Sequence, residues 1–134
     1  MQTFRIILCV LLLAGCATVE YQPRAISERE AYAVITEVAN QQTAATYLDS
    51  RFLGFRDEAD AATGTPQDIR ERIYFSSLDS IELRRHGPDY RVRLSGPGGD
   101  TLREFRIADR EQAERFVDAL AHYRDNAPAF TGLK

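Results

Sequence analysis

The most informative part of the chain is residues 81–107, which read IELRRHGPDYRVRLSGPGGDTLREFRI. Apolar and charged residues alternate over residues 90–94, which is the pattern of a β-strand with one face in the core and one in water. Glycine and proline mark a turn on each side of this strand, so the sequence predicts an antiparallel meander. The expected inward residues are Tyr90, Val92 and Leu94, and the expected outward residues are Arg91 and Arg93.

Side-chain parity and charge set the predicted registers of the two hairpins. A slip of one residue would move all the apolar side chains of a strand from the core face to the solvent face, so inward residues must oppose inward residues. Among the registers that remain, we favour those that place opposite charges across from each other. The expected partners are Glu82–Arg91 and Arg84–Asp89 in the first hairpin, and Arg93–Glu104 and Val92–Phe105 in the second.

Two amphipathic helices are expected to flank the meander. Residues 27–30 and 109–112 each fit a capping box, and an apolar stripe at helical spacing follows each of them. The helices are predicted to run to about residue 45 and about residue 124. Short strands are expected at 51–55 and 73–75, and residues 76–80 either kink one strand or separate two. The sequence therefore predicts an α+β fold with an N-terminal helix, an antiparallel meander of about four strands and a C-terminal helix.

The first sixteen residues carry the most specific motif of the chain. One cation, Arg5, precedes an unbroken apolar run over residues 6–14. As a helix this run would span only about 13 Å, against a hydrocarbon core of roughly 30 Å, so it is typical of a secretory signal. The sequence Leu13-Ala14-Gly15-Cys16 resembles the lipobox of bacterial lipoproteins.

The lipobox resemblance implies that Cys16 receives a diacylglycerol thioether and becomes the first residue of the mature chain. Residues 1–15 are then a removed signal peptide, and the several acyl chains that the family implies give stable anchoring. Retained inner-membrane lipoproteins often carry Asp after the cysteine, where this chain has Ala17. We therefore expect the periplasmic face of the outer membrane, or the plasma membrane if the source is not Gram-negative. Residues 16–26 are expected to be a lipidated N-terminus and tether before a single domain over residues 27–134. The ten residues 17–26 reach at most about 33–36 Å when extended.

Composition limits the classes of function. A chain of 134 residues, 44% of them hydrophobic, provides one domain with its own core. It carries 17 basic and 20 acidic residues, and loss of Arg5 changes the balance to 16 against 20, or −4. An acidic balance argues against a nucleic-acid partner. Because Cys9 leaves with the signal and Cys16 carries lipid, we expect no disulfide and no cysteine metal ligand.

Candidate catalytic and metal-binding residues do not form a recognisable constellation. Asp118 and His122 share a helix face, but two ligands without a third are interpreted as a surface pair. Residues 57–60 lack the acid spacing and the central glycine of a calcium loop, so they are interpreted as a solvated loop. Residues 96–99 have no lysine and no following helix, and are interpreted as a hairpin turn. We therefore expect no enzyme activity, no cofactor and no metal.

Arginine gathers on the predicted outward face of the meander. Guanidinium groups suit phosphate and carboxylate, so this face is a candidate site for lipid headgroups or for an acidic partner. A solvated face with weak cross-strand ion pairs is the alternative. The face comprises Arg84, Arg91, Arg93 and Arg106 against Glu82 and Glu104, an expected excess of two positive charges.

The order of elements in the last sixty residues resembles the second half of bacterial pleckstrin-homology-like domains. The chain departs from these domains at its start, where a helix and at most one strand stand in place of several strands. The matching segments are Ile73-Tyr74-Phe75, Leu78, Ile81-Glu82-Leu83, residues 90–94, residues 105–107 and the helix from Asp109.

Together these features predict a membrane-anchored envelope lipoprotein. Its small periplasm-facing domain is expected to be a binding or scaffolding module with an envelope protein as partner. A lipid-handling accessory protein is the alternative, and it requires an apolar cavity between helices and sheet. A small hydrolase is the further alternative, and it requires a polar cleft with converging acids or a histidine-centred pair.

Overall fold

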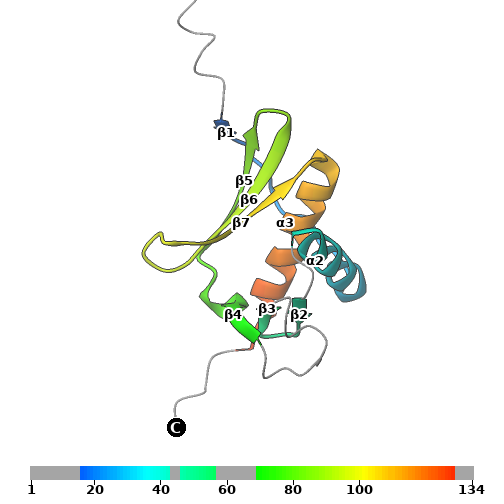
Figure 1. Ribbon diagram of the computed structural model, residues 1–134. Coiled ribbons are helices and arrows are strands. Elements are labelled where there is room, and N and C mark those ends of the chain that lie inside the picture. Colours follow the sequence, from blue (N-terminus) through cyan, green and yellow to red (C-terminus); the bar gives the residue numbers. More distant parts are fainter. Residues whose placement is uncertain (1–15, 43–45, 57–68, 129–134) are drawn as a thin grey trace, which may run out of the picture.

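The computed structural model of the protein describes residues 16–42, 46–56 and 69–128 (Figure 1). In this part of the chain, two helices and seven antiparallel strands form the α+β fold that the sequence predicts. Among these residues no helix is long and apolar enough to cross a membrane. The helices are α2 (Glu28–Gln42) and α3 (Arg110–Asp125), and they pack against each other on one face of the larger sheet.

The strands form two sheets rather than one. The four-stranded sheet has the order β1-β5-β6-β7, and the three-stranded sheet has the order β2-β3-β4. The four-stranded sheet contains β1 (Cys16–Thr18), β5 (Ser80–His86), β6 (Asp89–Ser95) and β7 (Thr101–Ile107). The three-stranded sheet contains β2 (Thr46–Leu48), β3 (Phe52–Arg56) and β4 (Ile69–Tyr74).

A 3-10 turn, η3 (Phe75–Ser77), separates the two sheets. The strand expected at residues 73–75 is the end of β4, which pairs with β3 instead of extending the meander. Phe75 is fully buried and its ring lies 5.0 Å from that of Tyr123 on α3. Anchoring of Phe75 under the helix redirects the chain. The segment expected at 76–80 therefore separates two strands, with Ser80 as the first residue of β5, and the meander has three strands.

The predicted register of the first hairpin is wrong by two residues. Glu82 pairs with Arg93 and Arg84 pairs with Arg91, so the pairs Glu82–Arg91 and Arg84–Asp89 do not form. The turn explains the difference. Gly87 has φ of +59° and is followed by Pro88, which fixes φ near −65°, and this combination suits a type II′ turn. The turn overrides charge pairing, because exposed ion pairs contribute little.

The second hairpin has the predicted register. Arg93 pairs with Glu104 and Val92 pairs with Phe105. Val92 and Leu94 are fully buried, as expected for inward residues. Residues 96–99 form the expected turn between β6 and β7, where Gly96 N donates a hydrogen bond to the Asp100 carbonyl at 2.9 Å.

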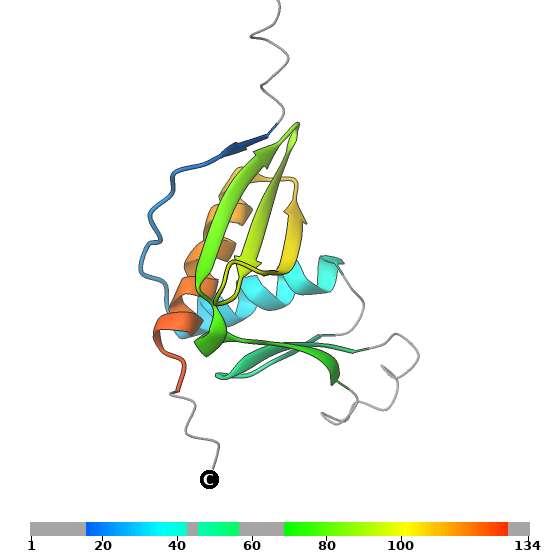
Figure 2. The same ribbon diagram turned by 90° about the vertical axis from the view of Figure 1, so that its left-hand side faces the viewer.

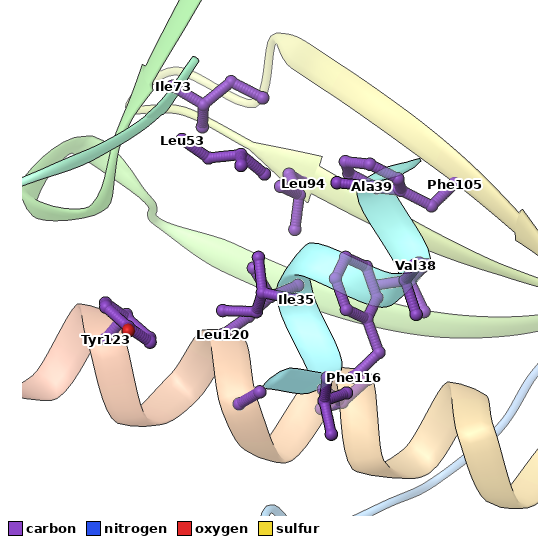
Figure 3. Packing of buried hydrophobic residues seen from close by; sticks show 14 of the residues in the cluster. Ile35, Val38, Ala39, Leu53, Ile73, Leu94, Phe105, Phe116, Leu120 and Tyr123 are labelled. Atoms are coloured by element: carbon purple, nitrogen blue, oxygen red, sulfur yellow. The ribbon is translucent and has the colours of Figure 1, made fainter. Parts of the chain in front are cut away.

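The core lies between the two helices and both sheets, and the three-stranded sheet contributes Leu53 and Ile73 to it (Figure 3). Phe105 from β7 meets Phe116 from α3 edge to face, with ring centroids 4.9 Å apart. Both helices begin as predicted: Glu30 N donates to Ser27 Oγ at 3.2 Å, and Gln112 N donates to Asp109 Oδ2 at 3.1 Å. The apolar stripes supply Ile35, Val38 and Ala39 from α2, and Phe116 and Leu120 from α3.

The segment between β1 and α2 runs along the domain beside α3 (Figure 2). Val19 N donates to the Leu83 carbonyl at 2.8 Å, which extends the pairing of β1 with β5. Tyr21 and Arg24 both bond to Asp118 on α3. The stretch expected to be an extended tether is thus held against the domain, because its backbone and side chains find partners there.

Candidate functional site

The outer face of the four-stranded sheet, turned away from the helices, carries the four predicted arginines. Pairing places Arg84, Arg91 and Arg106 directly beside one another on β5, β6 and β7. Arg93 lies in the next row, between Glu82 and Glu104. The parity of the strands brings them together, because the residues between them point into the core. We call Arg84, Arg91, Arg93 and Arg106 the arginine face.

Three of these arginines form ion pairs with carboxylates. Arg91 donates to Glu104 Oε1 at 2.8 Å and Arg93 donates to Glu104 Oε2 at 3.2 Å. The hydrogen bond from Arg91, reinforced by that from Arg93, lowers the pKa of the Glu104 carboxyl below its ordinary value. Arg106 donates to Asp89 Oδ2 at 2.6 Å.

The excess of positive charge is smaller than expected. Asp89 pairs with His86 across the hairpin and lies on the same side of β6 as Arg91, so it belongs to this face. Sequence reasoning placed it opposite Arg84 in the wrong register and did not count it against the arginines. Four arginines face three carboxylates, Glu82, Asp89 and Glu104, which leaves one positive charge.

Arg84 carries this remaining charge. Within the described residues no carboxylate pairs with it, and Glu82 accepts a hydrogen bond from Thr18 Oγ1 at 3.2 Å instead. The Nε atoms of Arg84 and Arg91 are both buried, and the described part of the chain offers neither a hydrogen-bond partner. Two like charges directly opposite each other on neighbouring strands destabilise the pairing. An anion that contacts both guanidinium groups would offset this repulsion, so the pair is the strongest candidate anion site on the face.

Cys16 lies at the end of the same sheet. Cys16 in β1 pairs with His86 in β5, and Thr18 pairs with Arg84. The row of Arg84 is two residues from the row of Cys16, or about 7 Å along the strands. This separation is comparable with the Debye length of about 8 Å at physiological ionic strength. The charges in the row of Arg84, Arg91 and Arg106 are therefore within electrostatic range of any surface that holds Cys16.

Family models, curated proteins and solved structures give no match to this chain. The resemblances to a lipobox and to a pleckstrin-homology-like domain therefore stay expectations. The geometry of the chain itself is what bears on its function.

The interpretation of Asp118 and His122 as a surface pair is wrong for Asp118. Asp118 is only 7% exposed, and its carboxylate accepts hydrogen bonds from the Tyr21 hydroxyl at 2.9 Å and from Arg24 N at 2.8 Å. His122 Nδ1 lies 3.5 Å from the amide nitrogen of Asn126. Over the described ranges, no three His, Cys, Asp or Glu side chains gather as metal ligands do. Residues 57–60 lie outside the described residues.

One contact that sequence reasoning missed closes the outer edge of β7. The side-chain amide of Gln42, at the end of α2, donates to the Arg106 carbonyl at 2.8 Å and accepts from Arg106 N at 3.3 Å. It occupies both backbone groups of a residue on an edge strand, which is where sheets are prone to unwanted pairing. A lone glutamine in a helix gives no sequence signal for this role.

Proposed function

We propose that the protein is an envelope lipoprotein anchored through Cys16, and that its domain is a non-catalytic binding module whose arginine face contacts anionic lipid headgroups. The observation that carries this proposal is the position of β1. The strand that contains Cys16 is an edge strand of the sheet that carries the arginine face. Each basic residue near an anionic membrane surface contributes about 1 kcal/mol to binding.

The location that follows is the periplasmic face of the outer membrane, or the plasma membrane in a source that is not Gram-negative. An envelope protein partner can bind while the anchor is in place, because the three-stranded sheet lies at the end of the domain opposite to β1 (Figures 1 and 2). The scaffolding role expected from the sequence is compatible with this arrangement.

The two alternatives have less support. A lipid-handling protein needs an apolar cavity between helices and sheet, but in the described residues that space holds the fully buried side chains of Ile35, Phe116 and Leu120. A small hydrolase needs converging acids in a polar cleft. A groove of about 680 Å³ between α2 and α3 is lined by Glu30, Glu37, Asp109 and Glu111 among others, but the Asp109 carboxylate there caps α3. No contact of these acids favours catalysis over binding.

The anchor is tested by acyl labelling in cells. Cys16→Ser should abolish incorporation of radiolabelled palmitate and move the protein out of the membrane fraction. Cys9→Ser is the matched control, because the signal peptide is removed, and it should leave both readouts unchanged. Labelling that survives Cys16→Ser would contradict the proposed anchor.

The arginine face is tested on vesicles without the anchor. A chain beginning at residue 16 with Cys16→Ser should bind phosphatidylglycerol vesicles more tightly than phosphatidylcholine vesicles. Arg84→Glu combined with Arg91→Glu should weaken this binding about tenfold or more, since two contacts reverse sign. The control, Arg110→Glu with Arg124→Glu on α3, makes the same change in net charge and should have little effect. Equal losses in the two double variants would refute a specific face.

A further inference from the structure

The outer face of the three-stranded sheet carries an aromatic cluster that the proposed function does not use. Phe52 is 7% exposed, yet it is not part of the core cluster between the two sheets and the helices. Its ring centroid lies 5.5 Å from that of Tyr47 and 5.4 Å from that of Tyr74. Phe52 pairs with Tyr74 across β3 and β4, so these rings share one face of the sheet.

Guanidinium groups cover this aromatic cluster. Those of Arg72 and Arg51 lie 5.4 and 5.8 Å from the ring centroid of Phe52, and that of Arg56 lies 5.9 Å from the ring centroid of Tyr47. All three distances are within the range of cation–π interactions. We call Tyr47, Phe52 and Tyr74 together with Arg51, Arg56 and Arg72 the aromatic–arginine surface.

In the described part of the chain, the aromatic–arginine surface carries an excess of positive charge. Arg51 pairs with Asp49 at 3.6 Å, and Asp49 is the only carboxylate that the described residues place against these three arginines. Glu71 directly precedes Arg72 on β4, so it has the opposite parity, and it pairs with Arg103 at 3.0 Å instead. Nε of Arg56 is buried and finds no hydrogen-bond partner among the described residues. Within these residues three guanidinium groups thus face one carboxylate, a larger excess than on the arginine face.

The aromatic–arginine surface lies at the end of the molecule opposite to β1 (Figures 1 and 2). Strand β5 runs from Ser80, near the three-stranded sheet, to His86 beside Cys16. Its six steps cover about 20 Å. That distance exceeds two Debye lengths, so a bilayer that holds Cys16 does not act on this surface.

We propose that the aromatic–arginine surface binds an acidic peptide segment of a protein partner in the aqueous space away from the membrane. Phe52 lies beneath the guanidinium groups, so the surface offers hydrogen-bond donors rather than an open ring for stacking. Packing on the rings holds the arginines in place, which reduces the entropy lost when they bind. Arginine forks match carboxylates in two-point hydrogen bonds, and an extended peptide with acids at alternate positions presents carboxylates about 7 Å apart on one side.

The test uses the full chain purified in dodecyl maltoside and a fluorescein-labelled peptide of four Glu-Ser repeats. Fluorescence anisotropy should show binding of this peptide and about tenfold weaker binding of the matching Gln-Ser peptide. Arg56→Glu with Arg72→Glu should weaken binding of the Glu-Ser peptide about tenfold or more. Arg84→Glu with Arg91→Glu is the matched control and should leave this binding unchanged.

Three results would overturn the proposal. The first is an equal loss of peptide binding in the two double variants, and the second is equal binding of the Glu-Ser and Gln-Ser peptides. The third is that binding to phosphatidylglycerol vesicles requires Arg56 and Arg72. Arg56→Gln with Arg72→Gln keeps much of the side-chain volume, and a circular dichroism spectrum unchanged in this variant separates lost binding from lost folding. Failure of this test leaves the membrane proposal standing, since that proposal depends on Arg84 and Arg91.

Discussion

At the scale of single residues, Asp118 holds the N-terminal segment onto α3. Its buried carboxylate accepts the Tyr21 hydroxyl at 2.9 and 3.1 Å and Arg24 N at 2.8 Å. A buried carboxylate without such partners would be costly, so the segment and the helix stabilise each other. Burial of the phenol, with a further contribution from its hydrogen bond to Asp118, raises the pKa of Tyr21 to about 12.

Tyr21→Phe should lower the free energy of unfolding by about 1–2 kcal/mol at neutral pH, because it removes a hydrogen bond to a charged group. The phenol keeps its proton up to about pH 12 in the fold, against 10.0 ordinarily. Its contribution is therefore complete below pH 10 and is lost as the pH rises toward 12. In urea titrations between pH 8 and 11.5, the free energy of unfolding should fall less with rising pH in the variant than in the unmodified protein.

Tyr32→Phe is the control for Tyr21→Phe, because the Tyr32 side chain is 50% exposed. It should leave both stability and its pH dependence nearly unchanged. The fall in stability with pH that remains in Tyr21→Phe is assigned to Tyr123, because burial also raises the pKa of the Tyr123 phenol. The same stability loss in both variants would mean that the bond to Asp118 contributes nothing specific.

Glu104→Gln should change stability and binding in opposite directions. Loss of the carboxylate removes two ion pairs and should lower the free energy of unfolding by about 1 kcal/mol at pH 7. Arg91 and Arg93 then lack their partner, so binding to phosphatidylglycerol vesicles should strengthen severalfold. Because the pKa of Glu104 is lowered in the fold, the stability difference should disappear as the pH falls below about 4.5. Weaker vesicle binding by this variant would contradict the assigned role of the face.

At the scale of elements, Gly54 lets the three-stranded sheet pack closely. A Cβ atom at this position of β3 would lie 2.8 Å from Ile69 Cγ2 and 3.3 Å from Phe52 Cε2. Gly54→Ala should therefore lower the free energy of unfolding by about 1–3 kcal/mol in urea titration. Gly96→Ala is the control, since its nearest contact is an ordinary 3.4 Å from Leu102, and a loss as large there would refute the packing argument.

The helices were predictable because their signals are local. Ser27 and Asp109 cap them, and the apolar stripes that follow lie in the core. The first hairpin register was not predictable from charge, since Gly87 and Pro88 set the turn. The three-stranded sheet was predicted only in part: the strand expected at residues 51–55 is β3, and the one expected at 73–75 overlaps the end of β4. Its strands are short, and β3 has apolar side chains on both faces, so no alternation marks it.

Part of the candidate site followed from alternation along the strands, which placed the four arginines on one outward face. That no carboxylate of the described residues pairs with Arg84 depends on the register, so the structure was needed to find it. The aromatic–arginine surface draws on β2, β3, β4 and the turn before β3, and pairing alone brings these segments together. No spacing within the sequence reveals such a surface.

At the scale of the whole molecule, the proposed anchor gives the domain a fixed orientation. The β5–β6 hairpin lies at the anchored end and the three-stranded sheet at the other. In nanodiscs with nitroxide-labelled headgroups, a fluorophore at Pro88→Cys of the acylated protein should be quenched strongly. A fluorophore at Ser50→Cys, in the turn between β2 and β3, should be quenched weakly. Equal quenching at the two exposed positions would show that the domain tumbles freely.

The pairing of β1 has a consequence for how the protein is made. Cys16 is the first residue of β1, so the bond that signal removal would cut, between Gly15 and Cys16, adjoins a strand paired with β5. Processing enzymes act on extended, accessible chain. If Cys16 is lipidated as proposed, β1 can therefore pair with β5 only after acyl transfer and cleavage are complete. Biogenesis then has a set order, in which export and maturation precede the last step of folding.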